Sequence, residues 1–262
     1  MIDVTQSETF PPEIEDIFLQ YVNRFSLNIV SEITSQNVEN ITDVRCAIEK
    51  YLAPFHAEAL YKEILLCFNR HSICCFHATK ILSEQSIWDK GLLTNEWEQY
   101  SNLLKDVLCQ TELSEPIIDE ALCYVEQEYQ RKYCFSPKPQ LYFFTPISAV
   151  DGGDSAGYDQ FCQNVGGELA RWSLMNKMPN VYKTLKAIGI PVIVEFELSF
   201  SDIANFQKES ISYCFVTYYS AKKFWKMDCP VIFDGSTEKG ILSSQIIKIH
   251  RYKEVDYEED FF

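Results

Sequence analysis

The chain lacks several features that mark particular classes of protein. No run of about 18 apolar residues occurs in its 262 residues, so we expect no transmembrane helix. The acidic N-terminal stretch MIDVTQSETFPPEIEDIF lacks the basic-then-apolar order of a signal peptide, which leads us to expect a cytoplasmic protein. No internal repeat or low-complexity segment is present. Hydrophobic residues make up 47% of the chain, which predicts a globular core.

Basic residues are also scarce. The chain has 23 lysines and arginines against 38 acidic residues, a formal net charge of −15. A field of this sign disfavours non-specific adhesion to nucleic acid or to an anionic membrane, and we expect no membrane partner. Two short basic clusters, in residues 131–138 and 222–226, are typical of solvated surface.

Ten cysteines are present without an export signal, mostly in apolar segments, which predicts free thiols. The stretch ICCFHATK contains Cys74 and Cys75, whose side chains would point to opposite faces of a strand. They could not easily hold one ion together, and no C-x2-C pair follows, so we expect no metal site. A nucleophilic Cys75 beside His77 is an alternative, but nothing else in the sequence indicates an oxyanion hole.

The first part of the chain predicts helices, and the later part predicts strands packed among helices. This order favours the α+β class, with a helical N-terminal region (1–70) before a second domain (71–262). Hydrophobic periodicity predicts helices over residues 11–33, 42–52, 56–69, 80–92, 96–130 and 158–175. Short apolar runs predict strands over residues 72–79, 140–147, 191–200, 213–219, 230–235 and 243–252.

The strand expected over residues 72–79 carries a possible ligand-binding face. Its alternation places Cys75, His77 and Thr79 on one side. An imidazole and a hydroxyl at a strand end could hold a ribose-like polyol through directed hydrogen bonds. The alternative is a histidine that is satisfied within the core.

Three stretches of the sequence together resemble the ADP-ribosyltransferase superfamily. FHATKILSEQSIWDKGL, which begins at Phe76, is similar to the first block of that family. LYFFTPISAV is similar to the second block, and KGILSSQIIKIHRY is similar to the closing block. The blocks follow the family's order over residues 71–252. The branch most resembled has a His–Tyr–[Glu/Asp/Gln] triad, of the diphtheria-toxin and poly(ADP-ribose)-polymerase type, which implies a split two-sheet α+β core.

The resemblance implies a role for five residues. His77 would hydrogen-bond the nicotinamide ribose, and Thr79 would support the adenosine side. Tyr142 would take the aromatic position of the second block, while Tyr158 is the better match to the tyrosine that stacks on nicotinamide. Gln245 would occupy the third position of the triad. The usual residue there is glutamate, and the uncharged glutamine favours single transfer over chain elongation.

The pair Gly166-Gly167 stands inside an expected helix. Each glycine there costs on the order of 1 kcal/mol relative to alanine, which suggests close approach by another backbone or by a ligand. Glu168 follows directly and could supply the charge that Gln245 lacks. The alternative is tight helix–sheet packing with Glu168 paired to Arg171.

The function that the resemblance implies is NAD-dependent mono-ADP-ribosyl transfer, with NAD⁺ as substrate and without a metal. The acceptor would be a protein, RNA or DNA, and the protein would be a bacterial toxin or a phage-defence effector. Residues 1–70 could dock an antitoxin or a chaperone. Two alternatives remain open: a catalytically inactive NAD-binding module of the same fold, and an NAD glycohydrolase.

Overall fold

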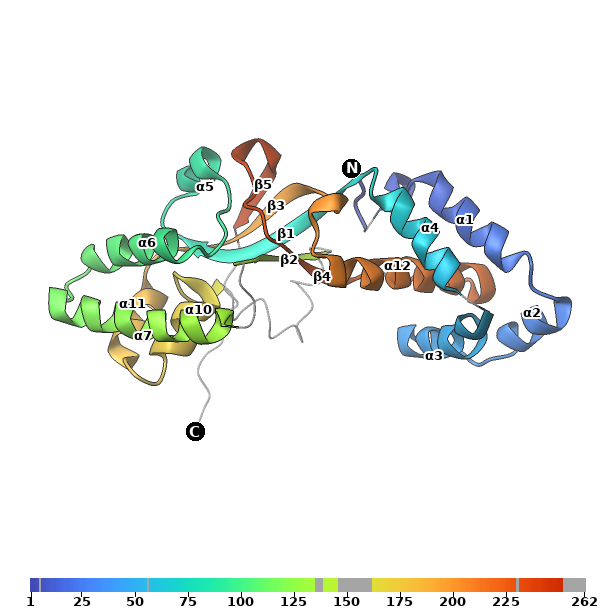
Figure 1. Cartoon of the computed structure of the whole chain (residues 1–262), viewed down its shortest axis with the longest axis horizontal. Helices are drawn as coiled ribbons and strands as arrows, with labels where there is room; N and C mark the ends of the chain where they lie inside the picture. Colours follow the sequence, from blue (N-terminus) through green and yellow to red (C-terminus); the bar gives the residue numbers. More distant parts are fainter. Residues whose placement is uncertain (5, 56, 135–138, 146–161, 230, 252–262) are drawn as a thin grey trace. The chain divides into compact units, whose positions relative to one another are not determined.

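The protein combines helices with one sheet (Figure 1). The computed structural model describes residues 1–4, 6–55, 57–134, 139–145, 162–229 and 231–251. Within these ranges, ten α-helices accompany a five-stranded sheet with the strand order β4-β2-β1-β3-β5. The expectation of a mixed α and β protein is confirmed. The two-sheet core is not confirmed, because the described strands belong to a single sheet.

β1 is the central strand of this sheet, between β2 and β3. At one edge, β3 and β5 pair in antiparallel fashion, with Val194 opposite Ile249 and a register shift between Glu195 and Phe196. Five of the six expected strands are confirmed, with small changes at their ends. The strands are β1 (Ser72–Ile81), β2 (Leu141–Thr145), β3 (Ile190–Ser199), β4 (Phe233–Thr237) and β5 (Ile246–Arg251).

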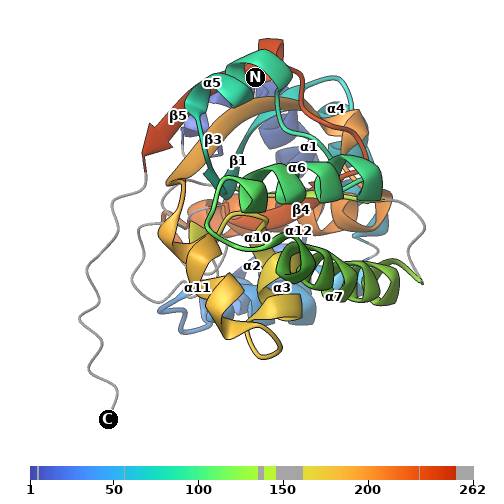
Figure 2. The ribbon, with the colours of Figure 1, turned by 90° about the vertical axis from the view of Figure 1, so that its left-hand side faces the viewer.

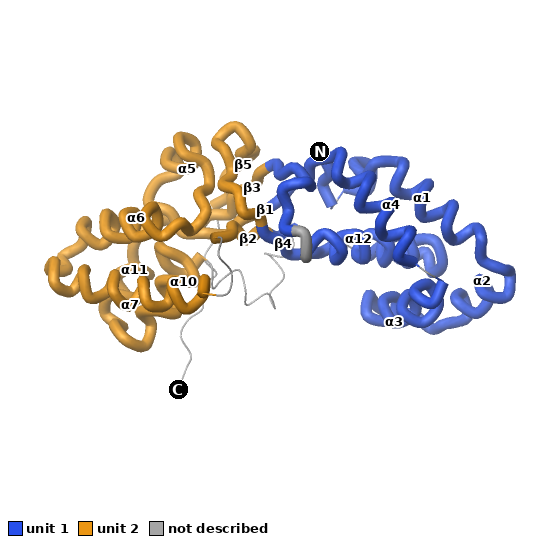
Figure 3. Tube along the Cα trace, in the orientation of Figure 1, with its two compact units in different colours: residues 1–75, 144–149, 197–236 blue, residues 76–143, 150–196, 237–262 orange. Residues whose placement is uncertain are grey.

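The chain divides into two compact units, which Figure 3 colours separately. The first unit comprises residues 1–75, 144–149 and 197–236, and the second comprises residues 76–143, 150–196 and 237–262. Among the described residues, the boundaries fall inside β1, β2, β3 and β4. The helices before residue 70 therefore share their unit with a helix from the last third of the chain.

The first unit is built from helices that pack through aromatic side chains. α4 contacts α1 and α12, and α12 also contacts α3. The helix expected over residues 11–33 is two helices, because Ser26 interrupts it and caps the second by accepting from the backbone N–H of Ile29. The helices are α1 (Pro12–Val22), α2 (Leu27–Thr34), α3 (Ile41–Tyr51), α4 (Glu58–Phe68) and α12 (Asn205–Ser220).

The strand expected over residues 213–219 is wrong, since this segment lies within α12. Its tyrosines, valine and threonine have high strand propensity, but tertiary packing overrides that preference. Phe215 packs its ring 4.6 Å from Phe68 and 4.9 Å from Phe10, and Tyr219 stacks on Phe18 of α1 at 5.7 Å. α12 has apolar residues on most of its sides, and this pattern is typical of a helix buried on several sides.

The second unit holds a separate group of helices beside its part of the sheet (Figure 2). α7 contacts both α6 and α10, and α10 contacts α11. These helices are α5 (Glu84–Lys90), α6 (Trp97–Cys109), α7 (Glu115–Tyr133), α10 (Gly167–Leu174) and α11 (Pro179–Ala187). Their fully buried side chains include Leu104, Leu108, Ala121, Val125, Ala170, Leu174 and Leu185. No helix in the described ranges is long and apolar enough to cross a membrane.

Gly91 ends α5, as expected, with a positive φ of 72°. Its backbone lies against the backbone of Ile241, and Leu92 and Ile241 exchange hydrogen bonds of 2.9 and 2.8 Å. A Cβ atom at position 91 would lie 1.8 Å from the carbonyl oxygen of Ile241. Only glycine satisfies both the backbone conformation and this contact.

Candidate functional site

The second half of β1 presents two polar side chains on one face. His77 and Thr79 are half-buried, whereas Ala78 and Lys80, which alternate with them, are buried. The ammonium group of Lys80 donates to the carbonyl oxygen of Lys186 at 2.5 Å. That carbonyl belongs to the last turn of α11, where a positive charge is favourable. The buried face of β1 therefore anchors the strand and leaves His77 and Thr79 on the other face.

His77 is held by the neighbouring strand. Its Nδ1 atom donates to the backbone carbonyl oxygen of Tyr142 in β2 at 2.7 Å. Burial lowers the pKa of His77 below its ordinary value of 6.5, and the hydrogen bond to Tyr142 only partly opposes this. The imidazole is therefore neutral at pH 7. With the proton on Nδ1, its Nε2 atom is a hydrogen-bond acceptor.

The ring of Tyr142 is the next member of the site. Tyr142 is 43% exposed, so part of its side chain is open to solvent. The ammonium group of Lys132, in the last turn of α7, lies 5.7 Å from the centre of this ring. This distance is within the range of a cation–π interaction.

Lys132 connects Tyr142 to an acidic residue. Its Nζ atom lies 3.1 Å from Oε2 of Glu168, and the two side chains are 32% and 40% exposed. Glu168 stands in the first turn of α10, where a carboxylate is favoured by the helix dipole. The expected alternative partner of Glu168 was Arg171, but the ion pair that the structure gives it is with Lys132.

The two glycines before Glu168 start α10; they do not interrupt a longer helix. Gly166 is the N-terminal cap, with φ of 84°, and Gly167 follows with φ of 59°. The close approach inferred at this point is made by a side chain, because the hydroxyl of Tyr100 donates to the carbonyl oxygen of Gly166 at 2.8 Å. The glycines thus fix the start of α10 and, with it, the position of Glu168 in the first turn.

Tyr133 completes the cluster and was not singled out from the sequence. Burial raises the pKa of its hydroxyl, while the charge of Lys132 and a hydrogen bond to Asn95 lower it. Tyr142 and Glu168 are both close enough to contribute to the same shift. The sequence signal for this part of the site is the basic pair Arg131 and Lys132, a pattern that is typical of solvated surface.

Gln245 occupies a local turn. It ends a short 3₁₀-helix, η5 (Ser243–Gln245), immediately before β5. Its side-chain oxygen accepts from the backbone N–H of Leu242 at 2.9 Å. The element η5 packs against α5. A hydrogen bond, a cation–π contact and an ion pair link His77, Tyr142, Lys132 and Glu168 in one cluster. Gln245 accepts from Leu242 in the turn before β5.

Two further expectations concern this site. Tyr158 lies outside the described residues. Thr79 lies two residues after His77 on the same face of β1 and is half-buried, so a molecule bound at His77 could also contact the Thr79 hydroxyl.

Metal and thiol chemistry find little support at β1. Burial raises the pKa of the Cys75 thiol well above its ordinary value, which disfavours the thiolate that a nucleophile or a metal ligand requires. Each of the ten cysteines has a free thiol, and Cys74 and Cys75 are both buried. Among the residues that the structure describes, no group of three or more His, Cys, Asp or Glu could hold a metal ion.

No family model, curated protein or solved structure matches the chain. Structural support for a function therefore comes from the cluster formed by His77, Tyr142, Lys132, Tyr133 and Glu168.

Proposed function

We propose that the protein is an NAD-dependent mono-ADP-ribosyltransferase. The sequence supports this through its three ordered blocks. The single structural observation that carries the proposal is the run of contacts from His77 through Tyr142 and Lys132 to Glu168. This run combines a neutral imidazole, an exposed aromatic ring and a carboxylate, the groups that such a reaction uses.

Some residues of the site would bind NAD⁺, and others would assist the transfer of ADP-ribose. The Nε2 atom of His77 would accept from a hydroxyl of the nicotinamide ribose, and Thr79 would contact the adenosine side. The ring of Tyr142 would pack against a planar part of NAD⁺, together with Tyr158. Glu168 would stand where positive charge develops, since a fixed carboxylate stabilises an oxocarbenium-like transition state. Gln245 would orient a ribose hydroxyl through its amide.

The transfer step breaks the bond between ribose C1′ and the nicotinamide nitrogen. The electron pair of that bond goes to the nitrogen, and nicotinamide leaves as a neutral molecule. A nucleophilic atom of the acceptor forms the new bond to C1′, and its proton passes to the carboxylate of Glu168. The ion pair with Lys132 holds the Glu168 carboxylate in position for that transfer.

Several finer expectations belong to the same proposal. They are a split two-sheet core, a cytoplasmic location and a role as a bacterial toxin or phage-defence effector. The acceptor would be a protein or a nucleic acid, and the net charge of −15 favours a protein. An antitoxin or a chaperone would dock on the helices before residue 70.

The test is incubation of the full chain with NAD⁺ labelled in its adenylate phosphate and with cell lysate. Separate protease and nuclease digestion of the product then identifies the acceptor. The informative variants are His77→Ala and Glu168→Gln. Matched controls are His71→Ala, which removes a histidine that precedes β1, and Glu98→Gln, which neutralises an exposed carboxylate on α6.

Loss of labelled macromolecule in both informative variants, with labelling retained in both controls, supports the proposal. Labelling that persists in His77→Ala and in Glu168→Gln contradicts it. Free labelled ADP-ribose without a labelled macromolecule would identify a glycohydrolase. Saturable NAD⁺ binding without any product would identify the inactive binding module.

A further inference from the structure

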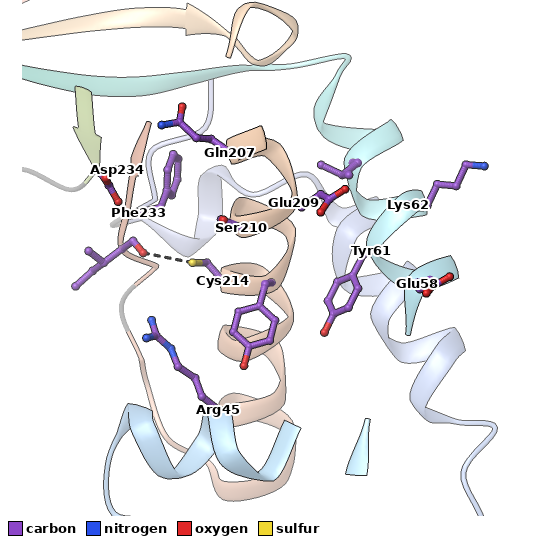
Figure 4. Close-up of a pocket in the computed structure, with 13 residues that line it drawn as sticks. Arg45, Glu58, Tyr61, Lys62, Gln207, Glu209, Ser210, Cys214, Phe233 and Asp234 are labelled. Atoms are coloured by element: carbon purple, nitrogen blue, oxygen red, sulfur yellow. Dashed lines mark hydrogen bonds between the residues drawn. The ribbon is translucent and has the colours of Figure 1, made fainter. Parts of the chain in front are cut away.

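The first unit contains a cavity of about 1090 Å³ that is formed within that unit alone. Its walls come from α3, α4, α12 and the segment that leads into β4 (Figure 4). This volume is close to the upper end of the range of sites that bind small molecules, roughly 300–1,000 Å³. The cavity shares no residue with the cluster around His77, so its ligand need not take part in the transfer reaction.

Two opposite charges approach the same point of this cavity. Arg45 of α3 and Asp234 of β4 both act on the half-buried thiol of Cys214, Arg45 lowering and Asp234 raising its pKa against a larger increase from burial. Figure 4 shows the three side chains on one side of α12. Within the part of the chain that the structure describes, neither Arg45 nor Asp234 forms an ion pair.

A buried hydroxyl lies close to the same arginine. Tyr213 lines the cavity, and its hydroxyl oxygen is buried without a hydrogen-bond partner among the described residues. Burial and the carboxylate of Glu49 raise the pKa of Tyr213, and the charge of Arg45 lowers it, so Arg45 acts on Tyr213 as well as on Cys214. Because an unsatisfied buried hydroxyl is unfavourable, a ligand group that accepts from Tyr213 would remove this penalty.

The rest of the lining limits the charge of the ligand. Leu65, Ile232 and Phe233 supply apolar surface beside the charged residues. The lining has three carboxylates, from Glu58, Glu209 and Asp234, against the two cations Arg45 and Lys62. A polyanion such as a nucleotide would be repelled by this excess of negative charge. A simple cation would leave Arg45 unpaired, and a simple anion would leave Asp234 unpaired.

We propose that this cavity binds a small zwitterion of the amino-acid and short-peptide class. The ligand carboxylate pairs with the guanidinium of Arg45 and accepts from the hydroxyl of Tyr213. Its ammonium group pairs with Asp234, and an apolar side chain packs on Ile232 and Phe233. A guanidinium binds a carboxylate through two parallel hydrogen bonds, which fixes the orientation of the ligand.

The experiment is calorimetric titration of the full chain with defined probes. Phenylalanine represents the free amino acids, and the dipeptide leucyl-phenylalanine represents the short peptides. Each probe is compared with its carboxyl-amidated form, which lacks the negative charge, and with its N-acetylated form, which lacks the positive charge. The variants are Arg45→Gln, Asp234→Asn and Tyr213→Phe, with Lys62→Gln as a control that removes the other cation of the lining.

In the wild-type protein, amidation and acetylation should each weaken binding by about tenfold or more, the effect of losing a charged hydrogen bond. Arg45→Gln should abolish the effect of amidation only, and Asp234→Asn should abolish the effect of acetylation only. Lys62→Gln should retain both effects, and Tyr213→Phe should weaken binding of the zwitterion. Binding of one probe and not of the other identifies the source of the ligand.

The proposal is overturned if neither probe binds saturably. It is also overturned if Arg45→Gln still distinguishes the acid from the amide as well as the wild-type protein does. Circular dichroism of each variant confirms that the fold is retained. Arg45 and Asp234 are exposed residues, so their substitution should not disturb the core.

Discussion

The Nδ1 atom of His77 lies 2.7 Å from the carbonyl oxygen of Tyr142, so the central strand β1 is tied to β2 through an imidazole ring. A carbonyl oxygen only accepts, so this contact fixes both the tautomer and the orientation of the ring. The same environment lowers the pKa of His77, because burial disfavours the charged form. The stability of the fold and, under the proposed function, the binding of NAD⁺ should therefore both depend on this proton.

The first prediction concerns stability against pH. Since the pKa of His77 in the folded protein is below the ordinary value of 6.5, the unfolded chain takes up this proton first as the pH falls. Stability is therefore fully present above that value and declines as the pH falls toward the folded pKa. Urea unfolding between about pH 7.5 and about pH 5 should show a larger loss for the wild-type protein than for His77→Asn. Equal losses in the two proteins would contradict this origin of the pH dependence.

The second prediction separates stability from activity at Lys132 and Glu168. The two side chains are 32% and 40% exposed, so their ion pair should contribute only roughly 0.5 kcal/mol to the free energy of unfolding. A double-mutant cycle with Lys132→Met and Glu168→Gln measures this coupling. Under the proposed function, Glu168→Gln should lower labelling by about 100-fold with little change in stability. A loss of activity that merely follows a loss of stability would argue against a role for Glu168 in transfer.

The third prediction concerns the start of α10. Gly166→Ala should lower the free energy of unfolding by more than about 1 kcal/mol, because an L-residue is strained at its positive φ. The added Cβ would also lie 2.9 Å from Cβ of Ala170 and 3.0 Å from the hydroxyl of Tyr100. Gly167→Ala is the matched control, since it shares the positive φ but meets no atom within 4 Å. Denaturant unfolding should rank Gly166→Ala as the more destabilised variant, and the reverse order would refute a packing role for Gly166.

The fourth prediction concerns Gln245. Gln245→Ala removes the acceptor for the N–H of Leu242 and should cost about 1 kcal/mol of stability, whereas Gln245→Glu keeps an acceptor there. Under the proposed function, labelling should fall only severalfold in Gln245→Ala, because Glu168 would carry the charge at the reacting centre. A fall as large as that of Glu168→Gln would instead make Gln245 the principal residue of the triad position.

Much of the fold follows from local signals in the sequence. The short apolar run around His77 predicted β1, and the spacing of apolar residues predicted α3 and α4 within two residues at each end. The segment in residues 213–219 was predicted wrongly because its conformation depends on distant partners. Phe215 and Tyr219 pack on Phe68 and Phe18, which precede them by about 150 and 200 residues.

The site shows the same limit. His77, Tyr142 and Glu168 were singled out from the sequence, and the structure links them through contacts. The linking residue, Lys132, was not recognised, because its partner Glu168 is 36 positions away. A basic residue on a helix end is typical of solvated surface, and only the tertiary structure brings this one against Tyr142 and Glu168.

The contact between Gly91 and Ile241 bears on how relatives of this protein could be recognised. Any side chain at position 91 would collide with the carbonyl oxygen of Ile241, so substitution there should be eliminated by selection whatever the chemistry of the site becomes. Divergent homologues should therefore retain a glycine at the end of the short helix that follows β1, even where the residue at the position of His77 differs. That glycine would provide a fixed position for aligning sequences that share the architecture but lack the proposed activity.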